Sequence, residues 1–243
     1  MAAWGGDVTF DVSVVSYGLP LLLRGLVNTV LFSLSAIAIA LVLAPVVAVG
    51  RLSGRAWLRW PATCYVEAVR NTPFLIQAFL FFYGLAALGV RVNAVLAGIV
   101  TLSIFGTATF SESFRGAIRS VPRGQLESAR AVGMSYRLAL QRVVFPQMWG
   151  YLIPALANQA AGIIKECAVL SVITVPEVAM AAQFVIGETF APAETYAMVA
   201  VLYWALTSAV TGLIALAKLV LTKRRRQPLA SARPPLELDY TEA

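Results

Sequence analysis

RGQLESARAVG, residues 123–133, is a polar and alanine-rich stretch within a very apolar chain. The uncharged stretches on either side of it, 92–111 and 143–164, are each long enough to cross a bilayer as a helix of roughly 20 residues. Charged side chains are expensive in the hydrocarbon core, so a segment of this composition between two spans stays outside it. The stretch therefore indicates a polar helical element that connects two membrane-spanning helices.

The composition of the whole chain agrees with a membrane protein. Of its 243 residues, 59% are hydrophobic and 13% are charged, whereas soluble domains have about 25% charged residues. Five uncharged runs reach bilayer length, namely 26–50, 71–90, 92–111, 143–164 and 195–217. We therefore expect an all-α polytopic membrane protein with five transmembrane helices. We divide it into an external N-terminal segment, a transmembrane domain and a basic, disordered tail, at 1–18, 19–222 and 223–243.

The basic residues are distributed unevenly along the chain. Most of the 19 lie after the first span, between the third and fourth spans, or after the fifth span, while 167–194 contains none. Basic loops stay in the cytoplasm, so we expect the N-terminus outside and the C-terminus inside. Asp7 and Asp11 stand where a signal peptide would carry positive charge, so we expect the first span to be retained. The basic tail is interpreted as a topology anchor and not as a nucleic-acid site.

Helix start and stop signals surround the opening stretch. Ser120 is a candidate N-cap, and Pro122 is suited to a first helical turn, where its missing N–H does no harm. Gly133 is suited to a left-handed helix stop, and Ser135 can cap a second helix that runs to Pro146. The sequence predicts a helix, a turn and a second helix on the cytoplasmic side.

The first of these helices has one apolar and one polar face. Leu126, Ala129 and Val132 recur every three residues and form a narrow apolar stripe. Glu127 and Arg130 have the spacing of an i, i+3 ion pair. The apolar face is expected to pack on the membrane bundle and the polar face to meet a partner. A cytoplasmic hairpin without a partner fits the same periodicity.

Four ordered motifs resemble one family of membrane proteins. ESARAVG, followed at a distance by FP, is similar to the cytoplasmic E-A-A-x-x-x-G…L-P signature of permease subunits of ATP-binding-cassette importers. FRGAIRSVPRGQLESARAVGMS, VRNTPFLIQ and ANQAAGIIKECAVLSVITVPE resemble stretches of the polar-amino-acid branch of that family. The resemblance extends from residue 19 to residue 222 and implies a type I importer permease fold.

In the family that it resembles, the polar stretch is the coupling helix, which docks on a separate ATPase subunit. The resemblance implies a coupling segment at 120–142 with Glu127, Ser128, Ala129, Arg130 and Gly133 in the docking surface. It also implies a second permease subunit, identical or homologous, an external solute-binding protein, and a place in the bacterial inner membrane. The implied function is ATP-driven import of polar amino acids or related zwitterionic solutes. ATP would be bound by the partner, with no cofactor and no enzymatic activity in this chain.

Two charged residues, Lys165 and Glu166, fall in an apolar part of the sequence, roughly 30 Å along a helix from Phe145. A charge at the bilayer centre costs on the order of 3 kcal/mol, so such residues usually face a cavity. A solute path or gate is one interpretation, and an internal ion pair or snorkelling to the outer surface is the other. Compared with the family's Lys-Asp-Thr/Ser-Ser, the stretch Lys165-Glu166-Cys167-Ala168 keeps the negative charge and loses two hydroxyls.

The predicted solute path contains polar residues of the second and fourth spans. An acidic side chain would meet a substrate ammonium, and amide groups would orient the polar end of the solute. Arg70 either neutralises a carboxylate or anchors the end of its helix. The candidate residues are Arg70, Gln77, Asn158, Gln159, Lys165, Glu166 and Cys167.

Several classes of function are excluded by missing residues. The chain has no histidine, which rules out a His-based triad or an H-E-x-x-H zinc site. No lysine follows a glycine, so a G-x-x-x-x-G-K-[ST] phosphate loop is impossible and ATP-driven work needs another subunit. No convincing metal or cofactor motif is present. An autonomous channel or secondary carrier is the main alternative function, and a small membrane-integral enzyme or scaffold is a second.

Overall fold

A computed structural model describes residues 11–225, and within that range the chain contains nine α-helices, one π-helical and one 3₁₀ segment, and no strand. The predicted all-α fold is therefore confirmed. The elements are α1 (Val12–Leu52), α2 (Ala56–Asn71), α3 (Phe74–Ala87), α4 (Ala94–Arg119), α5 (Arg123–Ala131), α6 (Tyr136–Ala139), the π segment η1 (Leu140–Val144), α7 (Phe145–Glu166), the 3₁₀ segment η2 (Cys167–Ile173), α8 (Val178–Thr189) and α9 (Pro192–Arg225).

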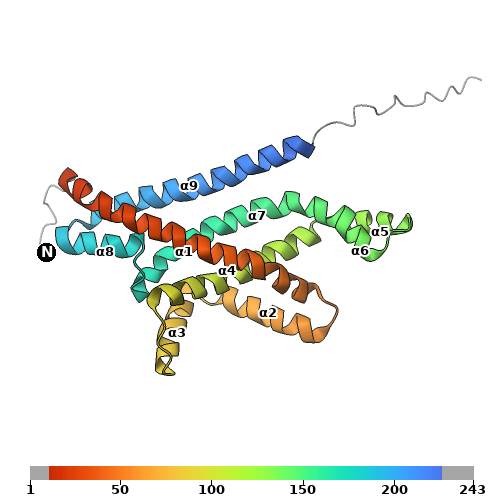
Figure 1. The fold of residues 1–243 in the computed structure, drawn as a ribbon, viewed down its shortest axis with the longest axis horizontal. Coiled ribbons are helices and arrows are strands. Elements are labelled where there is room, and N and C mark those ends of the chain that lie inside the picture. The colour runs from red at the N-terminus through yellow and green to blue at the C-terminus, as the bar shows by residue number, and fades with distance from the viewer. Residues whose placement is uncertain (1–10, 226–243) are drawn as a thin grey trace, which may run out of the picture.

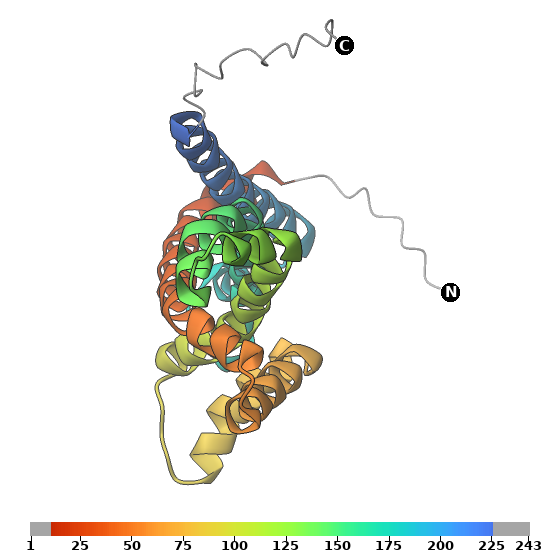
Figure 2. The same cartoon turned by 90° about the vertical axis from the view of Figure 1, so that its right-hand side faces the viewer.

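The long helices α1, α4, α7 and α9 extend along the longest axis of the molecule, as Figure 1 shows. The short helices α5 and α6 lie at one end of this bundle and α8 lies at the other, while α3 projects sideways (Figures 1 and 2). By length and composition, four helical stretches can cross a membrane: Val12–Leu52, Ala94–Arg119, Tyr136–Ile173 and Pro192–Leu216. They correspond to the first, third, fourth and fifth predicted spans.

The second predicted span, 71–90, is not one bilayer-length helix. It coincides with α3, which has 14 residues and is only about 21 Å long. The helix before it, α2, ends at Asn71 because Pro73 forces the preceding residue Thr72 out of the helical region, to φ −106° and ψ 133°. The count of five spans therefore holds only if α2 and α3 are taken together as one broken element.

The first helix is longer than the first predicted span. It begins at Val12, where the Asp11 side chain accepts a 2.8 Å hydrogen bond from the backbone N–H of Ser13. It then continues through Pro20 and Pro45 to Leu52. Residues 12–18 of the predicted external segment 1–18 are thus helical, and its first ten residues lie outside the described range. The predicted disordered tail, 223–243, also lies outside that range from residue 226 onward.

Small residues allow close packing at the centre of the bundle. Ala36, Ala40 and Ala44 of α1 are completely buried. A Cβ added to Gly106 of α4 would lie 3.1 Å from the Cβ of Ala40 and 3.0 Å from Cδ1 of Ile163 in α7. Even a methyl group at Gly106 would therefore require the facing side chains of α1 and α7 to shift.

Candidate functional site

The polar stretch from the opening of the sequence forms α5, which lies with α6 at the end of the bundle (Figure 1). Pro122 occupies its N-cap position, and Gly133 follows its C-cap with φ +88°. The N–H of Gly133 donates to the Arg130 carbonyl at 3.0 Å, and the N–H of Met134 donates to the Ala129 carbonyl at 3.2 Å. These two bonds form a Schellman motif, so the predicted left-handed stop at Gly133 is confirmed.

The two faces of α5 differ from the predicted faces in part. Leu126 packs against an apolar cluster of α4, η1 and α7, and Ala129 is buried. Glu127 and Ser128 are exposed. Val132 is 75% exposed although it belongs to the predicted apolar stripe, because the helix has already ended at this residue.

Three predictions about the coupling segment need correction. Ala129 is buried, which confirms its place in the apolar stripe but does not fit its predicted place on the open docking face. Glu127 and Arg130 form no ion pair in the described part of the chain. Ser120 does not cap α5, because α4 extends to Arg119 and the Ser120 hydroxyl donates instead to the Ala117 carbonyl at 2.8 Å.

The second helix of the predicted pair also differs. Ser135 caps it as predicted, with its hydroxyl accepting from the backbone N–H of Leu138 at 3.3 Å. The helix does not end at Pro146, however, because the π-helical turn η1 carries it directly into α7. A π turn before a proline avoids the clash that the ring would have with an α-helical carbonyl. The coupling segment is therefore continuous with the fourth span.

The polar residues of α7 divide between two faces. Asn158 and Lys165 are seven residues apart in one continuous helix, so they lie on one face, and both are exposed. Gln159 and Glu166 form the adjacent, half-buried face. Lys165 and Glu166 make no ion pair with each other or with any other described residue. The structure therefore brings these four predicted residues together along one side of α7.

Three other predicted path residues have different surroundings. Cys167 begins the 3₁₀ segment and is completely buried, so its thiol is not open to a solute. The Gln77 amide donates to the carbonyls of Val69 and Thr72 at 2.7 and 2.8 Å, which holds the end of α2 against α3. Arg70 lies 4.0 Å from a carboxylate oxygen of Glu112. Gln77 and Arg70 are thus engaged within the protein.

An ion-pair cluster at the end of α1, α2 and α4 was missed from the sequence. Glu112 of α4 accepts hydrogen bonds from Arg115 and from Arg51 of α1, and Arg51 also lies 3.3 Å from Glu67 of α2. The Arg51 side chain is only 9% exposed. The i, i+3 spacing of Glu112 and Arg115 was a usable signal, whereas the contacts to α1 and α2 join residues far apart in the sequence.

A second missed residue lies at the opposite end of the bundle. Glu177 is completely buried just before α8. Its carboxylate accepts from the N–H of Met180 at 2.8 Å and from the hydroxyl of Tyr203 in α9 at 2.9 Å. The N–H of Val178 donates to the Thr29 hydroxyl of α1 at 3.2 Å. The sequence signal was an acidic residue directly after Pro176 and before a helical pattern, which is typical of an N-cap.

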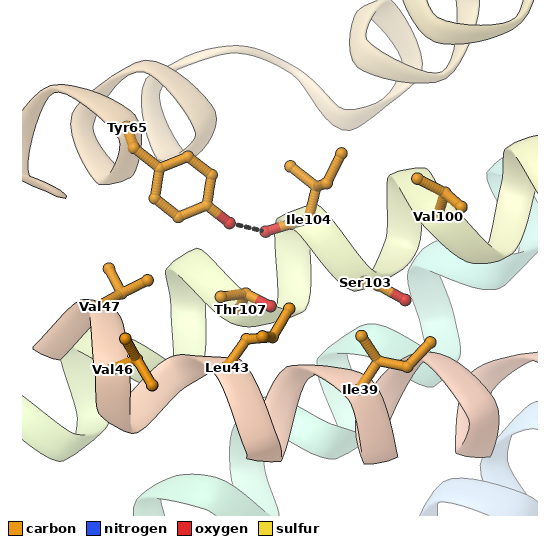
Figure 3. A pocket seen from close by; sticks show the side chains of 9 residues that line it. All are labelled: Ile39, Leu43, Val46, Val47, Tyr65, Val100, Ser103, Ile104 and Thr107. Atoms are coloured by element: carbon orange, nitrogen blue, oxygen red, sulfur yellow. Dashed lines mark hydrogen bonds between the residues drawn. The ribbon is translucent and has the colours of Figure 1, made fainter. Parts of the chain in front are cut away.

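Two grooves in the described part of the chain contain at most one of the predicted path residues. A groove of about 450 Å³ between α1, α2 and α4 is lined by six aliphatic side chains and by the hydroxyl-bearing side chains of Tyr65, Ser103 and Thr107, as Figure 3 shows. Its Tyr65 hydroxyl donates to the Ile104 carbonyl at 2.6 Å and is therefore already engaged. Gln77 lines a second groove, between α2, α3 and α4. The exposed face of α7 is thus the part of the candidate path that is open in a single copy of the chain.

Comparison with known proteins gives a consistent family. The family model for binding-protein-dependent transport system inner membrane components matches residues 36–222. A probable glutamine ABC transporter permease of Bacillus subtilis is 34% identical, over 81% of this chain and 91% of that protein. A probable amino-acid ABC transporter permease of Sinorhizobium fredii is also 34% identical, over 90% and 93%. A crystal structure of an amino acid ABC transporter with histidines has a TM-score of 0.81 and 31% identity, covering 86% of this chain and 98% of that one.

Proposed function

Because this chain belongs to the family of binding-protein-dependent transport system inner membrane components, we propose that it imports polar amino acids or related zwitterionic solutes. It is the membrane subunit of an ATP-binding-cassette importer, and the family works with an ATPase and a solute-binding protein.

The observation that carries the docking proposal is the position of α5. This helix lies at the end of the bundle, and it exposes Glu127, Ser128 and Arg130. Val132 adds an exposed apolar side chain beside Gly133. Small, polar and apolar groups together on a protruding helix suit insertion into a groove of a partner protein. We assign the segment 120–142 as the surface on which the ATPase docks.

The direct connection of this segment to two spans supports the assignment. Its first helix, α5, begins three residues after α4 ends, and its second helix, α6, runs through η1 into α7 without a break. A displacement of α5 by the ATPase would therefore act on the cytoplasmic ends of both spans. A hairpin without a partner would not need such a rigid connection on both sides.

The solute path is assigned to the side of α7 that carries Asn158, Gln159, Lys165 and Glu166. Lys165 is exposed in a membrane-spanning helix and lacks an ion partner in the described part of the chain, which is expensive unless it faces water, a solute or a second subunit. Its ammonium is suited to a carboxylate and the neighbouring Glu166 to an ammonium. Together they match the two charges of an amino acid. The names of the relatives, glutamine and amino-acid permeases, support the same solute class.

The basic residues determine the proposed orientation. The end of the bundle that carries α5 also carries most of the arginines between the third and fourth spans. We place this end in the cytoplasm and the end with α8 outside. A second permease subunit, identical or homologous, would cover the exposed face of α7.

Reconstitution tests this function directly. The chain is tagged, purified with its ATPase subunit, and placed in proteoliposomes with ATP inside or without it. We expect ATP-dependent uptake of at least one of glutamine, histidine and arginine when the solute-binding protein is supplied outside. Uptake without ATP would support the autonomous carrier instead, and purification without any ATPase subunit would contradict the docking proposal.

A further inference from the structure

Glu112 holds three helices together beside the docking segment. It accepts from both Nε and Nη2 of Arg115, which makes a two-pronged pair within α4, and from Arg51 at the end of α1. Arg70, in the last turn of α2, lies 4.0 Å from the same carboxylate. The carboxylate of Glu112 therefore connects α1, α2 and α4 at one level of the bundle.

The three arginines are held with different strength. The side chain of Arg51 is 9% exposed and that of Arg115 is 22% exposed, whereas that of Arg70 is 43% exposed. Separating Arg51 from Glu112 would leave a nearly buried charge without its closest partner, which is strongly unfavourable. Arg70 can move away and be hydrated by water. The contact between Arg70 and Glu112 is thus a part of the cluster that can open at little cost.

The contact joins α4, which leads into the docking segment, to the corner between α2 and α3. Glu112 lies about 10 Å along α4 from its end at Arg119, after which the segment 120–142 begins. Arg70 lies just before the break at Thr72 and Pro73, where α2 gives way to α3. The bonds from Gln77 to the end of α2 hold this corner together, so a displacement of the end of α2 would carry the start of α3 with it.

We propose that Glu112 and Arg70 are positioning residues that link movement of the docking segment to the α2–α3 corner. Glu112 keeps α1 and α4 together throughout, and its contact with Arg70 is made and broken as the ATPase moves α5. This proposal rests on the docking of an ATPase subunit at 120–142. It assigns Arg70 to coupling and not to the solute carboxylate.

The test uses the whole transporter complex in proteoliposomes and compares Arg70→Gln with Arg70→Lys. The probe is radiolabelled glutamine, histidine or arginine, whichever the wild-type complex takes up fastest. For Arg70→Gln we expect the solute moved per ATP hydrolysed to fall about two- to five-fold, the factor that a partly exposed ion pair is worth. The KM for the solute and the yield of complex should stay within two-fold of wild type. Arg70→Lys keeps the charge and should recover at least half of the lost ratio.

Three outcomes would overturn the proposal. An unchanged ratio in Arg70→Gln would mean that the contact transmits nothing. A raised KM with an unchanged ratio would mean that Arg70 binds the solute, and a Lys variant as poor as the Gln variant would mean that charge is not what matters. Arg119→Gln is the matched control, because Arg119 is an exposed arginine of α4 outside the described ion pairs, and it should behave as wild type.

A second variant tests the permanent part of the cluster. Glu112→Gln weakens the partner of Arg51 and should lower the yield of intact complex several-fold, and an undiminished yield would show that Glu112 does not hold α1 to α4. The proposed function is tested by the wild-type complex, and this inference is tested by the variants, so either can be contradicted without the other. If the wild-type complex shows no ATP-dependent uptake, the proposed function itself is wrong, whatever the variants do.

Discussion

The hydroxyl of Tyr203 in α9 donates a 2.9 Å hydrogen bond to the buried carboxylate of Glu177, directly before α8. The same carboxylate caps α8 through the N–H of Met180, and the adjacent N–H of Val178 reaches α1. One acidic side chain therefore anchors α8 to α9, while its neighbour anchors it to α1. This cluster holds together the end of the bundle that we place on the external side of the membrane.

Replacing Tyr203 tests the value of this bond. Tyr203→Phe removes one donor and leaves the Glu177 carboxylate with an unsatisfied oxygen, which costs about 1–3 kcal/mol in a buried site. We expect the Tm of the detergent-solubilised complex to fall by several degrees, measured by a thermal-shift assay. Tyr196→Phe is the matched control, because Tyr196 is 53% exposed on the same helix and makes no hydrogen bond within the described range. Equal Tm values for the two variants would show that the Tyr203 bond contributes no stability.

Gly133 gives a prediction that separates backbone strain from crowding. A Cβ at this position meets nothing within 4 Å, yet φ is +88°, so Gly133→Val should strain the turn by about 1 kcal/mol or more without a clash. We expect weaker association with the ATPase subunit, or hydrolysis uncoupled from uptake, while the chain still inserts in the membrane. Gly124→Ala is the control, because Gly124 is also open but lies within α5, and it should be neutral or slightly stabilising. Full coupling in Gly133→Val would argue that the segment is only a hairpin.

In the segment 120–142, features set by neighbouring residues in the sequence were predicted, whereas features set by packing against other helices were not. The stop at Gly133 and the cap at Ser135 are local, and both were predicted from the sequence. The burial of Ala129 and the exposure of Val132 depend on how α5 is rotated against η1 and α7, which periodicity of a nine-residue helix does not determine. Ser120 was misplaced because α4 runs further than its apolar stretch.

The long-range contacts were beyond sequence reasoning for the same reason. Arg51 and Glu112 are 61 residues apart, and nothing in either local pattern pairs them. Gln77 is a predicted path residue because it is a polar residue of the second span, whereas its amide donates to the end of α2 across the Thr72–Pro73 break. The five apolar runs gave the all-α membrane fold correctly, since hydropathy reflects the solvent of each segment and not its partners.

Charge reversal on the open face of α5 tests docking. Glu127 is exposed and outside the described ion pairs, so Glu127→Lys changes the surface without disturbing the fold. We expect a lower yield of ATPase subunit in pull-down from detergent extracts. Glu188→Lys, an equally exposed change on α8 at the other end of the bundle, should leave the yield unchanged. If both variants retain the ATPase equally well, Glu127 is not part of the docking surface.

Reporter fusions test the proposed orientation. A reporter fused after Arg226 should be cytoplasmic, and one inserted near Glu188 should be external, because basic loops stay inside. Alkaline phosphatase is active only outside and a fluorescent protein can report the inside, so each position is tested with both. Two positions on the same side of the membrane would contradict the proposed topology.

Glu166 tests the solute path. It is half-buried in α7 beside exposed Lys165, and it has no ion partner in the described part of the chain, so a role as a structural counter-ion has no support in its contacts. Glu166→Gln keeps the volume and removes the charge. A charge-assisted hydrogen bond to a substrate ammonium would become a neutral one, a difference of about 1–2 kcal/mol or a factor of roughly 5 to 30 in an equilibrium constant. We expect uptake to lose that factor in apparent affinity or rate, with complex yield and basal ATPase hydrolysis retained.

Gln183→Glu, on the exposed surface of α8, is a control for a change of charge away from the path. A collapse in complex yield would assign Glu166 to stability, and normal uptake with normal yield would remove it from both roles.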